Sequence, residues 1–150
     1  MPRVSRRRTI AAPRAEVWAL VSDPYNLPRW WPRTGRVESV EGEAGAEGTQ
    51  WTKVLETPEG RGVRADFRCS DALEGKRYAW EQRLADTPFE RHLRRYAVEI
   101  GLDDADAETA VTVIASQTLR GLSRLGSPMM RGAQAKVLDG ALDGLERALT

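Results

Sequence analysis

One short segment carries three side chains of the kinds that act on or orient a carbonyl group. His92, Arg94 and Tyr96 alternate along the segment Phe89–Leu102, so in a strand all three would point to the same face. A histidine or an arginine polarises a carbonyl, and a tyrosine hydroxyl donates a proton. The segment predicts either a polar patch facing a ligand or a solvated strand end. The intervening residues fit an inward face comparably well, because a register shift of one residue exchanges the two faces.

The rare residues exclude most metal and nucleophile chemistry. The chain has one cysteine, Cys69, and one histidine, His92, so it can form no internal disulfide, no thiolate cluster and no two-histidine metal centre. The sequence shows no glycine-rich phosphate loop, no nucleophile elbow and no pair of carboxylates set apart by spacing. We therefore expect no metal and no cofactor. The catalytic residues stay unassigned, with His92, Arg94 and Tyr96 as the candidates.

Length and composition indicate one ordinary globular domain over residues 1–150. Hydrophobic residues make up 41% of the chain and charged residues 30%, which is not the profile of a disordered protein. The 23 basic and 22 acidic side chains leave a net charge of +1, which argues against a dedicated nucleic-acid-binding protein. No apolar run approaches the roughly 20 residues of a membrane-spanning helix, and the basic start lacks the apolar stretch of a secretory signal. We expect a cytoplasmic protein without integral membrane association. The sequence does not indicate its oligomeric state.

The periodicity of apolar residues predicts an α+β chain. Between Gly35 and Leu119 strand-like segments are joined by short turns, which is typical of an antiparallel meander. Val63–Ser70, for example, alternates apolar and charged side chains. Helical signals lie on both sides of the meander, with Pro13 and Pro24 each placed to open a short helix. The last segment predicts a long helix with one leucine face, made by Leu138, Leu142, Leu145 and Leu149.

The same C-terminal helix carries three glycines, which are unfavourable in a helix. Gly132, Gly140 and Gly144 are separated by multiples of four, so they lie roughly along one line. Each costs about 1 kcal/mol relative to alanine. This alignment indicates either close packing against strand backbone or space left for a ligand.

Four short phrases near the N-terminus stand out together with this order of elements. They are Ile10-Ala11-Ala12-Pro13, Glu16-Val17-Trp18, Asp23-Pro24 and Leu27-Pro28-Arg29-Trp30-Trp31-Pro32. The sequence resembles the START-like (SRPBCC) superfamily, in its polyketide cyclase/dehydrase and lipid-transport branch. The resemblance implies the helix-grip fold: a curved antiparallel sheet of about six or seven strands around a long C-terminal helix, with two short helices after the first strand. It implies function less sharply, because the superfamily hosts carriers, cyclases, quinone-binding proteins and chaperone activators.

A curved sheet closed by one helix leaves an apolar cavity, which is the default binding site. Trp80 shares a strand face with Tyr78 and Gln82, and a buried amide without partners costs about 1–3 kcal/mol. That face is therefore expected to open onto the cavity. Aromatic and flexible side chains in phase with it complete the expected ligand-binding residues: Trp31, Trp51, Phe67, Tyr78, Trp80, Gln82, His92, Tyr96, Met130, Ala133 and Val137.

The leading functional hypothesis is binding of a small hydrophobic molecule, such as a lipid or a polyketide, in that cavity. The first alternative is a polyketide aromatase/cyclase or dehydrase, for which the sequence offers no clear match to the cavity arginine that the resemblance implies. The second alternative is a chaperone-activator-like interaction module with a filled interior and an exposed apolar patch. The sequence leaves open whether the chain is an enzyme, which ligand it takes and which proteins it contacts.

Overall fold

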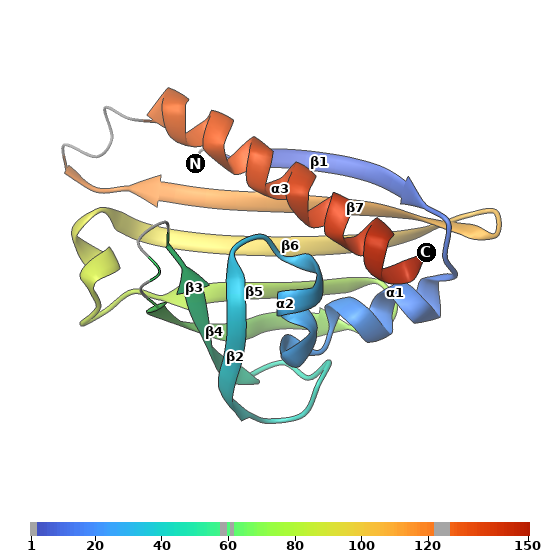
Figure 1. The fold of residues 1–150 in the computed structure, drawn as a ribbon, viewed down its shortest axis with the longest axis horizontal. Helices are drawn as coiled ribbons and strands as arrows, with labels where there is room; N and C mark the ends of the chain where they lie inside the picture. The colour runs from blue at the N-terminus through green and yellow to red at the C-terminus, as the bar shows by residue number, and fades with distance from the viewer. Residues whose placement is uncertain (1–2, 58–59, 61, 122–126) are drawn as a thin grey trace.

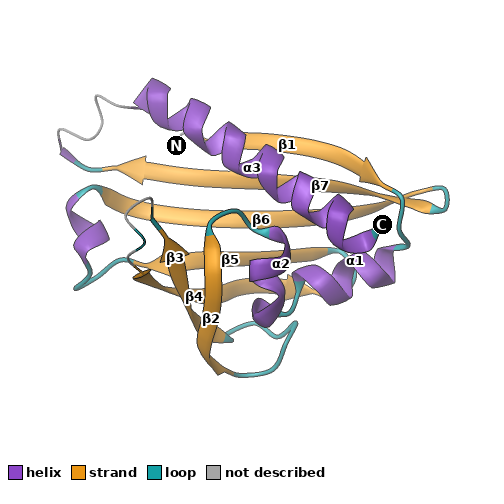
Figure 2. Cartoon of the chain, viewed as in Figure 1, coloured by secondary structure: helices purple, strands orange, loops and turns teal. Residues whose placement is uncertain are grey.

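Seven antiparallel strands form one sheet in the computed structural model, which describes residues 3–57, 60, 62–121 and 127–150 (Figure 1). The strand order is β1-β7-β6-β5-β4-β3-β2. The strands are β1 (Arg3–Ile10), β2 (Thr34–Glu41), β3 (Gln50–Glu56), β4 (Gly62–Leu73), β5 (Arg77–Arg83), β6 (Leu93–Ala105) and β7 (Glu108–Leu119). The helices are α1 (Arg14–Val21), η1 (Pro24–Asn26), α2 (Leu27–Trp30), η2 (Pro88–Arg91) and α3 (Ser127–Leu149). The expected α+β helix-grip architecture is confirmed, including the short helices after the first strand (Figure 2).

The sheet is curved because several strands break their register. Pairing shifts occur twice in β2, once in β4 between Cys69 and Asp71, and once in β6 between Leu93 and Arg95. Such bulges bend a strand and increase its twist. The consequence is visible in Figure 1, where β2 and β3 turn steeply away from the direction of β6 and β7. Helix α3 lies across β1 and β7, with α1 and α2 beside its C-terminal end.

Helix α3 is buried unequally along its length. The leucine face is sealed in the C-terminal half, where Leu138, Leu142 and Leu145 are 0–1% exposed. The first turns are different: Met130 is only half-buried, and Met129 is 81% exposed. The hydrophobic core therefore holds one half of the helix firmly and the other half loosely. No helix among the described residues has the length and apolar character needed to cross a membrane.

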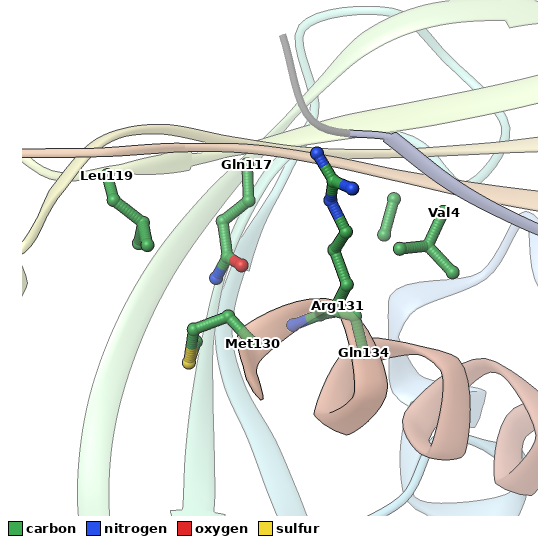
Figure 3. A pocket seen from close by; sticks show the side chains of 7 residues that line it. Val4, Gln117, Leu119, Met130, Arg131 and Gln134 are labelled. Carbon is green, nitrogen blue, oxygen red and sulfur yellow. The ribbon is translucent and has the colours of Figure 1, made fainter. Parts of the chain in front are cut away.

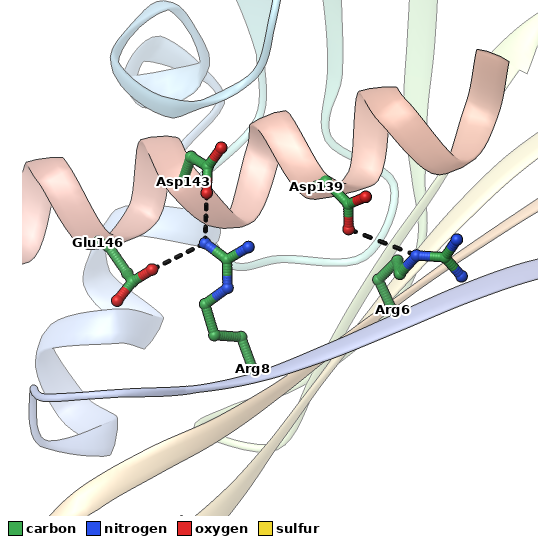
Figure 4. Close-up of polar contacts among 5 residues, drawn as sticks. All are labelled: Arg6, Arg8, Asp139, Asp143 and Glu146. Carbon is green, nitrogen blue, oxygen red and sulfur yellow. Dashed lines mark hydrogen bonds and ion pairs between the residues drawn. The ribbon is translucent and has the colours of Figure 1, made fainter. Parts of the chain in front are cut away.

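Ion pairs add to the hold on the C-terminal half of α3. Arg6 on β1 lies 3.3 Å from Asp139, and Arg8 donates to Asp143 at 2.5 Å and to Glu146 at 2.7 Å (Figure 4). These side chains are partly exposed, and exposed pairs contribute only about 0.2–1 kcal/mol each. Arg8 joins two carboxylates at once, which raises the pKa of its guanidinium. The network therefore sets the position of α3 along β1 more than it stabilises the fold.

Two of the three glycines in α3 lie where a neighbouring segment packs closely against the helix backbone. A Cβ on Gly144 would lie 2.2 Å from the carbonyl oxygen of Trp30, and one on Gly140 would lie 2.9 Å from Cγ of Pro32. A Cβ on Gly132 would meet nothing within 4 Å. The close-packing interpretation is confirmed for Gly140 and Gly144, but the partner is α2 and the turn after it rather than strand backbone. Gly132 faces open space.

Replacing Gly144 by alanine should destabilise the protein, because the backbone carbonyl of Trp30 cannot rotate away as a side chain could. Overpacking costs about 1–3 kcal/mol, against a helix-propensity gain of about 1 kcal/mol. Gly132→Ala is the matched control and should be neutral or stabilising by up to about 1 kcal/mol. Guanidinium unfolding of both variants measures the difference. Equal unfolding free energies for the two would show that the α2–α3 approach is not a constraint.

Candidate ligand-binding site

The loosely held half of α3 borders a narrow pocket. The pocket opens between β1, β7 and the first turns of the helix, and Figure 3 shows Gln117 and Leu119 pointing from β7 toward Met130. The space between its walls is about 280 Å³, a volume that includes open solvent at its mouth. Its closed part holds about one water molecule, so a larger guest requires the first turns of α3 to move outward. The lining residues are Val4, Ala115, Gln117, Leu119, Met130, Arg131 and Gln134.

A row of side chains leads from this pocket across the concave face of the sheet. Gln117 on β7 pairs with Tyr96 on β6. On β5, Gln82 lies one residue beyond the last β5–β6 pair, Glu81 and Ala97, and so lies next to Tyr96. Gln82 in turn pairs with Phe67 on β4, and Phe67 pairs with Trp51 on β3. Antiparallel partners opposite one another point to the same face. Gln117, Tyr96 and Gln82 therefore form a polar row, which is followed on the same face by Phe67 and Trp51.

Two amides, of Gln82 in this row and of Gln134 beside it, each have one buried atom without a hydrogen-bond partner in the described part of the chain. These atoms are Nε2 of Gln82 and Oε1 of Gln134, on α3. Burial raises the pKa of Tyr96 to about 12, with the Gln134 side chain acting in the opposite direction, so its hydroxyl stays protonated at neutral pH. A buried polar atom without a partner costs about 1–3 kcal/mol. Folding does not explain this cost, whereas a ligand with complementary polar groups would remove it.

The aromatic residues expected to line the cavity form a packed cluster beyond the row. Trp31 and Trp80 meet at 5.3 Å between ring centroids, Trp30 and Trp31 at 5.4 Å, and Trp51 and Trp80 at 6.2 Å, all edge to face. Trp51 stacks on Phe67 at 6.1 Å. Such pairs contribute about 0.5–1.5 kcal/mol each beyond their burial. The rings, with Tyr78, thus form one rigid wall of the interior.

A lysine lies inside this aromatic cluster. Lys53 on β3 is 5% exposed, and its Nζ sits 4.8 Å from the ring centre of Phe67 and 5.5 Å from that of Trp31. Within the described residues it has neither a salt bridge nor a hydrogen bond. Burial lowers the pKa of Lys53 to about 8. Contacts with two ring faces are worth roughly 0.5–2 kcal/mol, so they offset only part of the desolvation.

The structure separates the three candidate catalytic residues. His92 is exposed at the end of η2, and Arg94 is exposed on β6, while Tyr96 faces the interior. The expectation that all three share one strand face is wrong for two local reasons. Pro88 opens a 3₁₀ turn where the strand was expected to run, and the register shift between Leu93 and Arg95 changes the phase. No shared site is formed by His92, Arg94 and Tyr96.

The remaining predicted ligand-binding residues do not all line the pocket. Sequence reasoning also missed three residues of the interior. Met130 borders the pocket, Val137 packs against the core, and Ala133 is exposed. The aromatic residues and Gln82 lie on the concave side of the sheet or, for Trp31, against it. The missed residues are Lys53, Gln117 and Gln134. Lys53 stands two residues after Trp51, so strict strand alternation would have placed it on the buried face.

Replacing Lys53 by methionine should stabilise the protein at neutral pH. The pKa of Lys53 falls from about 10.4 in the unfolded chain to about 8 in the folded protein. This difference corresponds to a folding free-energy cost of about 3 kcal/mol for the charged lysine, before the ring contacts are counted. A lowered lysine pKa penalises folding below pH 8, and the penalty disappears as pH rises to about 10.4. We expect a gain of about 1–3 kcal/mol at pH 7 that shrinks above pH 8.

Urea unfolding of Lys53→Met at pH 7 and pH 10 tests this expectation. The exposed Lys136→Met on α3 serves as the control and should change stability by less than about 0.5 kcal/mol at both pH values. A loss of stability in Lys53→Met at pH 7 would contradict an uncompensated buried charge.

The sequence and the fold of this chain are similar to those of known proteins. Residues 1–150 match the family described as polyketide cyclase / dehydrase and lipid transport. A START superfamily protein from Mycobacterium smegmatis has 15% identity and a TM-score of 0.77, covering 98% of this chain and 96% of that one. A protein from Thermus thermophilus has 20% identity and a TM-score of 0.75, covering 99% and 97%. No curated protein matches the chain in sequence.

A third similar structure is the di-domain ARO/CYC protein BexL from the BE-7585A biosynthetic pathway. It has 19% identity and a TM-score of 0.77, covering 98% of this chain but 46% of BexL. At these identities the likenesses establish the fold, and the match over residues 1–150 establishes the family. The chain therefore belongs to the polyketide cyclase/dehydrase and lipid-transport family, and its START-like fold is that of a hydrophobic-ligand-binding domain.

Proposed function

We propose that this protein binds a small hydrophobic molecule between the concave face of β5–β7 and the N-terminal half of α3. One observation carries the proposal: Gln82 and Gln134 keep buried amide atoms without partners beside Tyr96, at the end of the sheet that the helix covers only loosely. Ligand sites are mostly apolar with a few polar groups that fix orientation. The row Gln117, Tyr96 and Gln82 supplies those groups, and the rings and leucines supply the apolar surface.

Because α3 is packed less tightly in its first turns, a ligand can enter the pocket at that end of the helix. Its C-terminal half is fixed by buried leucines, by the approach of Gly144 to Trp30 and by the ion pairs from β1. Its first turns carry Gly132 in open space and the flexible Met130 at the pocket. An outward movement of these turns alone would widen the pocket, because few buried contacts oppose it.

The likeness to the ARO/CYC protein BexL raises cyclase chemistry as a second candidate. Of the candidate residues, Tyr96 alone is oriented toward the interior, and its hydroxyl is held protonated. The interaction-module alternative would use exposed apolar side chains. The large ones described, Tyr25, Leu73 and Met129, lie on three separate elements. Binding without an assigned reaction is the function that these observations support best.

Titration with the neutral fluorophore N-phenyl-1-naphthylamine tests the proposal. The wild-type protein should bind it saturably with enhanced emission. Met130→Trp fills the pocket and should weaken binding at least tenfold, about 1.4 kcal/mol. Met129→Trp adds the same ring one residue away at a position 81% exposed, and should leave affinity within about twofold. Equal affinities for both variants, or no saturable binding by the wild type, would refute this site.

A further inference from the structure

The interior from Gln82 toward β3 contains hydrogen-bond donors without acceptors in the described part of the chain. Nε1 of Trp51 and Nε2 of Gln82 are buried and unpartnered in the described chain. The Lys53 ammonium, with three N–H donors, contacts ring faces in place of an acceptor. All three side chains flank Phe67: Trp51 stacks on its ring, Gln82 pairs with it across strands, and Lys53 lies over its face.

The charged neighbours of Lys53 do not supply the missing anion. On β2, Arg36 and Glu38 pair with each other, and Glu38 also accepts from Arg64 on β4, on the outer side of the sheet. Asp66 on β4 accepts from Thr52 there. The inward partners of Lys53 across the strands are Val37 and Ala65, which carry no charge.

A carboxylate is the group that complements such a place. It is an acceptor only, it accepts several hydrogen bonds at once, and it brings the negative charge that a buried ammonium lacks. An alcohol or an amide would bring further donors into a place that already has an excess of them. An ester or ketone would accept hydrogen bonds but leave the charge of Lys53 without a counter-charge.

We infer that the ligand is an amphipathic carboxylic acid whose carboxylate is bound by Lys53, Trp51 and Gln82 and whose apolar part runs past Tyr96 to the pocket at Met130. This inference rests on the proposed function and names the chemical class of its ligand. The aromatic wall shields the charge pair from water, which strengthens the attraction. The lysine is retained despite its cost to folding because the ligand supplies its partner.

A ligand carboxylate placed next to Lys53 makes ligand binding depend on pH. The free protein holds Lys53 with a pKa of about 8, and a bound carboxylate favours the charged form. The affinity for an acid should therefore fall as pH rises above 8, where the amine of the free protein is neutral. The affinity for an uncharged analogue of the same shape should not change over that range.

Competition against N-phenyl-1-naphthylamine with two matched pairs tests the inference: dodecanoic acid against 1-dodecanol, and 2-naphthoic acid against 2-acetylnaphthalene. At pH 7 the wild type should prefer the acid of at least one pair tenfold or more, and the preference should fall at pH 9.5. Lys53→Met should abolish the preference while still binding the fluorophore and the neutral analogues. Lys136→Met, which alters an exposed lysine, should retain the preference.

The outcomes separate this inference from the proposed function. Equal affinities for acid and neutral analogue in both pairs, or a preference that survives Lys53→Met, overturn the carboxylate assignment and leave hydrophobic binding in place. Absence of saturable fluorophore binding by the wild type overturns the proposed function, and the assignment with it. Circular dichroism of Lys53→Met confirms that a lost preference does not come from unfolding.

Discussion

The approach of α3 to α2 is the constraint on which the rest of the structure depends. Gly144 lets the helix backbone come against the carbonyl of Trp30, and this contact places Trp30 and Trp31 over the sheet, where they meet Trp80. The leucine face and the arginines of β1 then fix the same half of the helix. With one half anchored in this way, the other half can border a pocket without supporting the core.

The interior accepts local costs that a purely structural core would avoid. A lysine among aromatic rings, an amide on the concave face and indole N–H groups without acceptors each oppose folding. Such breaches of the usual rules gather at functional sites. Here Lys53 and Trp51 on β3 and Gln82 on β5 lie on either side of Phe67 in β4, on the concave face of the sheet. Their grouping is the physical reason for treating them as one site rather than as separate imperfections of packing.

Local patterns predicted the helices and strands, and the family resemblance implied how they are arranged. The alternation in Val63–Ser70 and the leucine spacing of the last helix are set by short-range geometry, which a sequence displays directly, whereas the N-terminal phrases were informative through the resemblance they carry. Gln82 shares the concave face with Trp80, as its strand phase indicates, and a glutamine there is conspicuous in an apolar strand face. Gln134 could have been found in the same way, since it lies one helical turn before Leu138 and one after Met130.

The errors arose where pairing between strands decides the outcome. The register shift near Arg94 depends on how β6 meets β7, and alternation within the segment alone does not reveal it. The same limit applies to the glycines: their alignment indicated a close neighbour, but the choice of α2 over a strand is a property of the assembled fold. Residues whose roles depend on one element were predictable, and those whose roles depend on two were not.

The protonation states inside the protein bear on whether binding or catalysis is the better interpretation. A cyclase needs a group that accepts a proton near neutral pH. The described interior offers two phenols, of Tyr78 and Tyr96, whose pKa values are both raised by burial, which keeps them protonated. Lys53, with a pKa of about 8, is neutral in about a tenth of molecules at pH 7, and a bound anion would lower that fraction further. An interior rich in donors and poor in bases is suited to holding an anion, and less suited to deprotonating a chain of ketones.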